Sequence, residues 1–218
     1  GSWGTVLADI AANNGSEVLI WSRNANIVNE INTNHTNKKY CGRKKLHKNI
    51  KATSNQKDVL ILSHVIVCIP SSSVRSFFRK NKKFIVSDTS FLIASKGLEK
   101  NTFFSMSEIL KEELGMESNI SVLSGPNLAS EIIEGMAAAC VIAAKNKKTG
   151  KEFLKILDRQ SFKVFLNNDV KGVELAGALK NIYAIVSGLS DGLGNKKNTK
   201  AMILTLSLIH ISEPTRQE

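Results

Sequence analysis

At 218 residues, the chain is long enough to bury a substantial core as one large or two small domains. Its hydrophobic fraction of 42% and charged fraction of 22% are ordinary for a soluble globular protein. No uninterrupted apolar run approaches the ~20 residues that a bilayer span needs, and the first residues lack the pattern of a signal peptide. We therefore expect a cytoplasmic protein with no membrane span.

The net charge of +11 raises the question of a nucleic-acid partner. The basic residues are dispersed in pairs and triples, and the few aromatic residues are not interleaved with them as a base-stacking surface requires. We therefore expect solvated surfaces with some attraction for anionic metabolites, and no nucleic-acid partner. A basic nucleic-acid-binding module is the alternative from a different class.

The three cysteines and four histidines are scattered along the chain. Cys68 and Cys140 lie inside apolar runs, and Cys41 is far from both, so no CxxC spacing is present. This pattern is typical of buried thiols in a reducing compartment and predicts no metal site.

Apolar runs alternate with helical patterns over most of the chain. In chain order we expect a helix over residues 6–12, a buried strand over 17–21 and a helix over 25–32. Further strands are expected over residues 65–69, 84–87, 91–94, 120–123, 138–144 and 163–166, and further helices over 71–80 and 103–114. Apolar strands that alternate with helices predict an α/β fold whose doubly wound, mostly parallel sheet is covered on both faces.

The character of the sequence changes after Asn168, because residues 170–193 form one long and mostly apolar helical pattern. We therefore expect an α/β domain over residues 1–168 and the start of an all-helical domain over residues 169–205.

Two features of the first half predict a dinucleotide site. Gly1 and Gly4 could be the last two glycines of a GxGxxG motif, which lets backbone approach a pyrophosphate at a helix N-terminus. Arg23 follows the strand at residues 17–21, where an acid would bind the ribose diol and an arginine instead tolerates a 2′-phosphate. We therefore expect a Rossmann-like domain that takes NADP or NAD. An ordinary glycine pair and a surface arginine are the alternatives at this point.

Lys180 lies in the apolar helical pattern, where Glu174 is the only other charged residue between Val173 and Leu189. Such a lysine either extends to the surface or points into a pocket. Burial lowers the pKa of an ammonium group, which suits proton transfer near neutral pH. Hydride delivery to a ketone needs a proton donor at the developing alkoxide, so Lys180 is our candidate catalytic residue.

Two further segments follow expected strands. Lys96 comes directly after the strand at residues 91–94, and Ser124-Gly125-Pro126-Asn127 comes after the strand at 120–123. Ligands of open α/β sheets bind outside the carboxyl ends of the strands, so both segments are candidates for ligand contact, although a loop lysine is often only solvated.

Taken together, these segments resemble the bacterial NAD(P)-dependent glycerol-3-phosphate dehydrogenase family. The matching segments, in order, are GSWGTVLA at residue 1, VCIPSSSVR at 67, ASKGLE at 94, SGPNLASEI at 124, GVELAGALKNIYAI at 172 and DGLGNKKNTKAMILT at 191. The resemblance implies reversible reduction of dihydroxyacetone phosphate to sn-glycerol 3-phosphate, the precursor of glycerophospholipids. A homodimer is the assembly considered.

The resemblance also implies roles for single residues. The expected cofactor contacts are Ser2, Trp3, Arg23, Lys96 and Ala129. The expected substrate contacts are Lys96, Gly125, Asn127 and Lys180, with Lys180 as the proton donor and acceptor. Another β-hydroxyacid or 6-phosphogluconate-like dehydrogenase is the alternative enzyme, because it also sets a lysine on a helix after a Rossmann domain.

The chain departs from the family pattern at both ends. The family's first strand and first glycine would precede Gly1, so we expect unpaired strand edges in the sheet. After Thr205 the residues 206–218 resemble a translated sequencing adapter rather than the family's helical domain with its Ser-Arg-Asn cluster. We therefore expect a gene fragment with a non-native tail that is inactive by itself.

Overall fold

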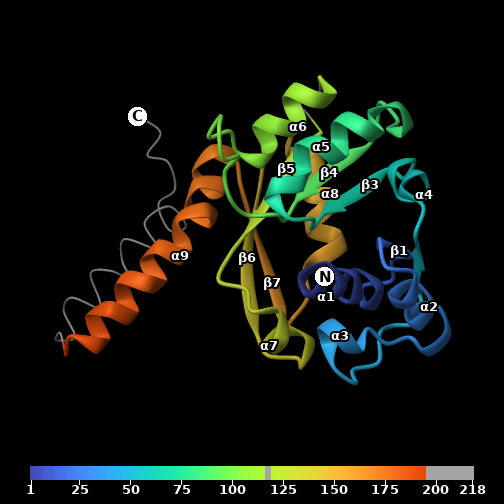
Figure 1. Cartoon of the computed structure of the whole chain (residues 1–218), viewed down its shortest axis with the longest axis horizontal. Helices are drawn as coiled ribbons and strands as arrows, with labels where there is room; N and C mark the ends of the chain where they lie inside the picture. Colours follow the sequence, from blue (N-terminus) through green and yellow to red (C-terminus); the bar gives the residue numbers. More distant parts are fainter. Residues whose placement is uncertain (116–118, 195–218) are drawn as a thin grey trace.

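The computed structural model describes residues 1–115 and 119–194 as an α/β fold that ends in a long projecting helix (Figure 1). The strands are β1 (Val18–Trp21), β2 (Ile50–Thr53), β3 (His64–Val67), β4 (Ser90–Ile93), β5 (Ile120–Ser124), β6 (Ala138–Ala144) and β7 (Phe162–Asn167). The helices are α1 (Ser2–Asn13), α2 (Ala25–Asn34), α3 (Lys38–Cys41), α4 (Gln56–Leu60), α5 (Ser71–Asn81), α6 (Met106–Leu114), α7 (Ala129–Ile133), α8 (Lys147–Leu157) and α9 (Val170–Gly192), with a 3₁₀ turn at Lys82–Phe84.

The strands form two separate sheets. The larger has the order β3-β4-β5-β6-β7 and is parallel except between β5 and β6, whereas β1 and β2 form a parallel pair of their own. The α/β fold with a mostly parallel sheet that the sequence predicts is therefore confirmed. The strand edges of β1 and β3 are not hydrogen-bonded to each other, as expected from the sequence.

Helices cover both faces of the larger sheet. In β4, Phe91 and Ile93 pack into one hydrophobic cluster with α5 and α6, while Leu92, with Ala94 directly after the strand, packs into another with α1 and α8. Successive side chains of a strand point to opposite faces, so a strand buried on both faces must be apolar throughout. This explains why the continuous apolar runs were a reliable sign of β4 and β5.

Three expectations about single elements need correction. Residues 84–87 are not a strand: Phe84 ends the 3₁₀ turn, Val86 is exposed, and the segment only links α5 to β4. The strand at Val18–Trp21 exists but is half-exposed rather than buried, because one of its edges borders a cavity. Helix α6 begins at Met106, not at residue 103, because Ser105 caps it together with Glu108 in a capping box.

The sequence reasoning also missed β2. Only Ile50 and Ala52 of this strand are buried, and Lys51 between them is exposed, so its apolar signal is short. In the part of the chain that the structure describes, no helix is both long and apolar enough to cross a bilayer. The expected tail at residues 206–218 lies outside the described residues.

Candidate active site

Lys96 lies at the carboxyl end of β4 in the loop that leads to α6. The preceding Ser95 hydroxyl donates hydrogen bonds to the carbonyl oxygens of Val67 and Ile69, which tie the start of the loop to the end of β3. The Lys96 ammonium donates a hydrogen bond of 2.8 Å to the carbonyl oxygen of Gly125. Two loops that follow neighbouring strands are thus joined by this lysine.

Burial, together with the nearby positive charge of Lys180, lowers the pKa of Lys96 to about 8. The two lysines, which are 84 positions apart in sequence, therefore lie close enough for the charge of Lys180 to act on Lys96. This shift at Lys96 was not anticipated from the sequence. At neutral pH Lys96 keeps its proton, but it is poised to lose it in mildly basic solution.

Lys180 is carried by α9, which packs against β5 (Figure 1). Gly177, one turn before Lys180, is buried, and a Cβ atom there would lie 2.6 Å from the Ser124 hydroxyl oxygen and 3.9 Å from Cγ of Lys96. The lack of a side chain at Gly177 therefore lets the helix approach the carboxyl ends of β4 and β5 closely. This approach brings Lys180 beside Lys96.

Glu174 lies three residues before Gly177 on α9 and binds the start of α6. Its carboxylate accepts hydrogen bonds from the Ser105 hydroxyl at 2.7 Å, the Ser107 backbone N–H at 2.9 Å and the Ser107 hydroxyl. Burial raises the pKa of Glu174, while the hydrogen bonds from Ser107 and Ser105 act in the opposite direction. Sequence reasoning assigned no role to Glu174, although its isolation in an apolar helix was a usable signal.

The loop after β5 supplies the third part of the site. Gly125 is buried so tightly that a Cβ atom would lie 2.8 Å from the carbonyl oxygen of Ala139 and 3.1 Å from the side-chain nitrogen of Asn127. Both polar atoms of the Asn127 amide are buried and lack a hydrogen-bond partner among the described residues. A buried amide without partners is costly, so it marks a place where a polar ligand would complete the hydrogen bonding.

The residues expected to hold a cofactor lie elsewhere. Ser2, Trp3 and Arg23 line a cavity of about 1250 Å³ between the unpaired edges of β1 and β3, where the family's first strand is expected from the sequence. Neither Lys96 nor Lys180 lines this cavity, but Ile69, which does, accepts a hydrogen bond from Ser95, the neighbour of Lys96. A second pocket beside Lys96 has room for about one water molecule (10 Å³). Ala129 begins α7 and packs near α1, so the structure places it in neither pocket.

The end of this cavity at the N-terminus of α1 has features that suit a dinucleotide. No side chain caps the N-terminus of α1, so its first backbone N–H groups are available to a phosphate. The indole N–H of Trp3 is buried without a hydrogen-bond partner among the described residues, and Arg23 is exposed at the rim after β1. An anionic ligand with several acceptors would satisfy these groups.

The residues of the described ranges contain no group of His, Cys, Asp or Glu side chains that could hold a metal ion. The candidate site consists of two lysines, a buried amide and a cavity edged by a helix N-terminus. Together with the sheet topology, this arrangement defines the chain as a Rossmann-like α/β protein with a helical C-terminal part.

Comparison with known proteins narrows this class to a family. A sequence profile described as the NAD-dependent glycerol-3-phosphate dehydrogenase N-terminus matches residues 1–150, and the corresponding C-terminus profile matches residues 169–216. The chain belongs to this glycerol-3-phosphate dehydrogenase family, as the resemblance of its motifs predicts.

Individual relatives agree with this assignment. The chain is 38% identical to a glycerol-3-phosphate dehydrogenase [NAD(P)+] of Macrococcus caseolyticus over 97% of its length, and 36% identical to one of Bacillus anthracis over all of it. It spans 65% of the length of each relative. Among solved structures, the glycerol-3-phosphate dehydrogenase of Coxiella burnetii superposes with a TM-score of 0.83 at 32% identity, covering 96% of this chain and 64% of that one.

Proposed function

We propose that this chain forms the cofactor-binding and part of the substrate-binding region of an enzyme that reduces dihydroxyacetone phosphate to sn-glycerol 3-phosphate with NADPH or NADH. The observation that carries the proposal is the meeting of Lys96, Lys180 and the Gly125–Asn127 loop at the carboxyl ends of β4 and β5. Such a cluster of cations beside a buried amide suits a small phosphorylated ketone.

In this proposal Lys180 handles the proton. A reduced nicotinamide, with the cofactor phosphates held at the N-terminus of α1, would supply the hydride to the C2 carbon of the ketone. As the carbonyl π electrons move to oxygen, the Lys180 ammonium donates a proton to that oxygen and becomes a neutral amine, which then regains a proton from solvent. Lys96, which stays protonated at neutral pH, and the Asn127 amide orient the substrate and stabilise its negative charge.

The cofactor contacts that we propose are Ser2, Trp3, Arg23, Lys96 and Ala129, with Arg23 allowing NADPH to bind as well as NADH. We further propose a domain boundary near Asn168, a small-molecule substrate without a nucleic-acid partner, a homodimer and a cytoplasmic location. The free thiols of Cys41, Cys68 and Cys140 support a reducing compartment.

The decisive experiment uses a chimaera, because the chain spans 65% of its relatives. This chain replaces the matching part of the Macrococcus caseolyticus relative, which supplies the rest of the sequence. We expect oxidation of NADPH that depends on dihydroxyacetone phosphate and yields glycerol 3-phosphate, with little or no turnover by the chain alone.

The same assay separates the alternative enzyme class. Oxidation of 6-phosphogluconate or a β-hydroxyacid with NADP, without any reaction of dihydroxyacetone phosphate, would favour the other dehydrogenases. If the chimaera is folded and binds NADPH but turns over none of these substrates, the proposal fails. Salt-sensitive retention of duplex DNA by the chain would instead support the binding module.

A further inference from the structure

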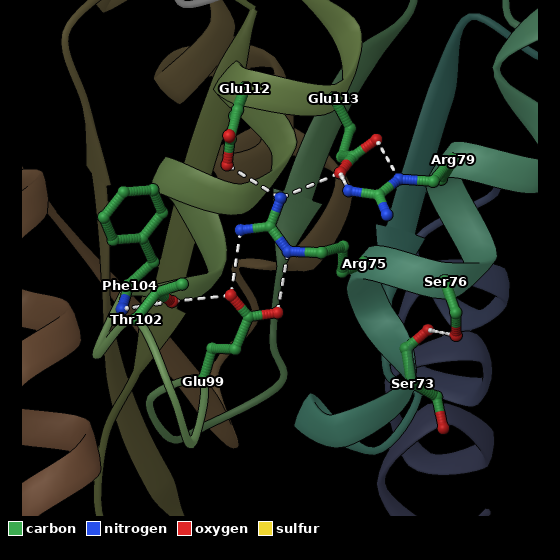
Figure 2. A network of polar contacts seen from close by, with 9 residues as sticks. All are labelled: Ser73, Arg75, Ser76, Arg79, Glu99, Thr102, Phe104, Glu112 and Glu113. Atoms are coloured by element: carbon green, nitrogen blue, oxygen red, sulfur yellow. Dashed lines mark hydrogen bonds and ion pairs between the residues drawn. The ribbon is translucent and has the colours of Figure 1, made fainter.

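One guanidinium group joins three elements beside the candidate active site. In Figure 2, Arg75 of α5 binds both carboxylate oxygens of Glu99, with Nε at 2.7 Å and the second terminal nitrogen at 2.9 Å. Its other terminal nitrogen binds Glu112 at 2.7 Å and Glu113 at 2.8 Å, both on α6. The Arg75 side chain is only 18% exposed, so these charges are held together with limited access of water.

The loop that contains Lys96 contacts α5 at two points. Gly97 has a φ of +126°, and a Cβ atom there would lie 3.2 Å from the hydroxyl oxygen of Ser71, the first residue of α5. Glu99 meets Arg75, which is one helical turn after Ser71 on the same face of α5. The backbone from residue 97 to residue 99 therefore lies along α5 and is fixed at both ends.

Contacts within the loop make Glu99 a rigid point. Its carboxylate also accepts a hydrogen bond from the Thr102 hydroxyl at 2.6 Å, and its backbone pairs with Phe103 and Phe104 in a tight turn. The Phe104 ring packs over the guanidinium of Arg75, 5.9 Å from its centroid (Figure 2). Movement of Glu99 would therefore shift the whole turn.

We propose that Arg75 is a positioning residue for Lys96, acting through the bidentate Arg75–Glu99 ion pair that holds the 96–99 backbone along α5. On the other side of Lys96, the Ser95 hydroxyl is tied to the end of β3. Lys96 therefore lies between two fixed points of the loop, Ser95 and Glu99, and the position of Glu99 depends on Arg75. The importance of this ion pair for catalysis rests on the proposed function, whereas its effect on Lys96 can be tested without any activity.

Both partners of the Arg75–Glu99 ion pair stay charged at physiological pH. The Arg75 guanidinium, helped by the Thr102 hydroxyl, holds the pKa of Glu99 at about 2. Glu112 and Glu113 fix the guanidinium from the α6 side, so it cannot follow Glu99 if the loop moves. A guanidinium suits this role because its planar fork binds a carboxylate with two nitrogens, which a lysine cannot do.

Arg79 provides a matched control. It lies one turn further along α5 and binds Glu113 at 2.6 Å, but it has no hydrogen bond to Glu99 and its side chain is 64% exposed. Arg75→Met and Arg79→Met therefore remove the same charge from the same helix. Only the first variant removes the contact with the loop.

The test measures the titration of Lys96 in this chain. Each variant is labelled briefly with acetic anhydride over a range of pH, and labelling of the Lys96 peptide is quantified by mass spectrometry. In the parent, half-maximal labelling is expected at a pH of about 8, as set by burial of Lys96. In Arg75→Met we expect this midpoint to rise by about one pH unit or more toward the value of 10.5 for a solvated lysine, because the loop loosens and water reaches the amine. In Arg79→Met it should stay at the parent value.

Unfolding is monitored separately by the circular-dichroism melting temperature of each variant. If Arg75→Met is not folded, Glu99→Gln decides the question, because it keeps the shape of the side chain and weakens the ion pair, and a smaller rise is expected. An unchanged midpoint in a folded Arg75→Met overturns the proposal, and so does an equal rise in Arg79→Met. Where Arg75→Met is not folded, an unchanged midpoint in Glu99→Gln overturns it. None of these results would bear on the proposed reductase function.

Discussion

The two sides of the molecule are built differently. On the side of β4, β5 and α9, the two lysines are held by contacts within the described chain: Lys96 by its hydrogen bond to Gly125, and Lys180 by the close packing of Gly177 on the same helix. On the side of β1 and β2, the strands are half-exposed and Trp3 and Arg23 face a cavity of about 1250 Å³. The lysines are thus held in place, whereas Trp3, facing the cavity, has an indole N–H without a partner among the described residues. The two sides should respond separately to mutation.

The largest expected effect separates chemistry from cofactor binding. In the chimaera, Lys180→Ala should lower kcat by about 10²–10⁴-fold, because it removes the proton donor of the transition state. NADPH affinity, measured by fluorescence titration, should stay unchanged, since Lys180 is not among the residues that line the cavity. A variant with the parent's kcat would refute the role of Lys180.

A second prediction concerns the anchor of α9. Glu174→Ala should lower the free energy of unfolding of the chain by about 1–3 kcal/mol, because hydrogen-bond donors of Ser105 and Ser107 lose their buried acceptor. Glu174→Gln, which keeps an acceptor oxygen, should cost less. Urea unfolding provides the measurement, and an equal loss in both variants would show that the acceptor is not what matters.

The raised pKa of Glu174 adds a pH dependence with a definite sign. Above about 4.5, the unfolded chain releases the Glu174 proton before the folded protein does, so this group lowers stability as pH rises through that window. The free energy of unfolding of the parent relative to Glu174→Gln should therefore fall from pH 4 toward neutrality. A relative stability that rises over the same range would contradict the burial of this carboxyl.

Two glycines of α9 offer a smaller and well-matched comparison. A Cβ atom at Gly188 meets nothing within 4 Å, so Gly188→Ala should stabilise the chain by about 0.5–1 kcal/mol through helix propensity. In Gly177→Ala the new methyl group meets Ser124, so this gain should be lost and turnover of the chimaera should fall. Equal stabilisation by both substitutions, measured by urea unfolding, would mean that α9 does not depend on close approach at Gly177.

The smallest effect belongs to the cofactor side. Arg23→Gln should raise the Kd for NADPH by up to about fivefold and affect NADH less, because an exposed charge pair contributes up to ~1 kcal/mol. Isothermal titration with the chimaera would measure both affinities. A uniform loss for both cofactors would contradict a 2′-phosphate contact, and a lower kcat with unchanged affinity would contradict the separation of the two sides.

The sequence predicted strands correctly where their side chains are buried on both faces of the sheet. Strands such as β4, buried on both faces, have a continuous apolar signal, whereas β2 buries only Ile50 and Ala52 and was missed. The apolar run at residues 84–87 looked like a strand, but it pairs with no neighbour. Local patterns indicate how apolar a segment is, and tertiary pairing decides what it becomes.

The same limit applies to the candidate site. The motifs around Lys96, Gly125, Asn127 and Lys180 were visible in the sequence, and the structure brings them to one edge of the sheet. The contacts that support these residues were not visible in the sequence, because Glu174 binds a serine 69 positions away and Arg75 binds a carboxylate 24 positions away. Nothing local in the sequence identifies such partners.

The central claim is that Lys96 and Lys180 belong to one site. It can be tested directly by treating this chain with a short bifunctional amine reagent and identifying the cross-linked peptides by mass spectrometry. We predict a Lys96–Lys180 cross-link, with no link from either lysine to Lys163, which is exposed on β7 and bound to Asp158. Single labelling of both lysines in the folded chain, with no cross-link between them, would contradict the account.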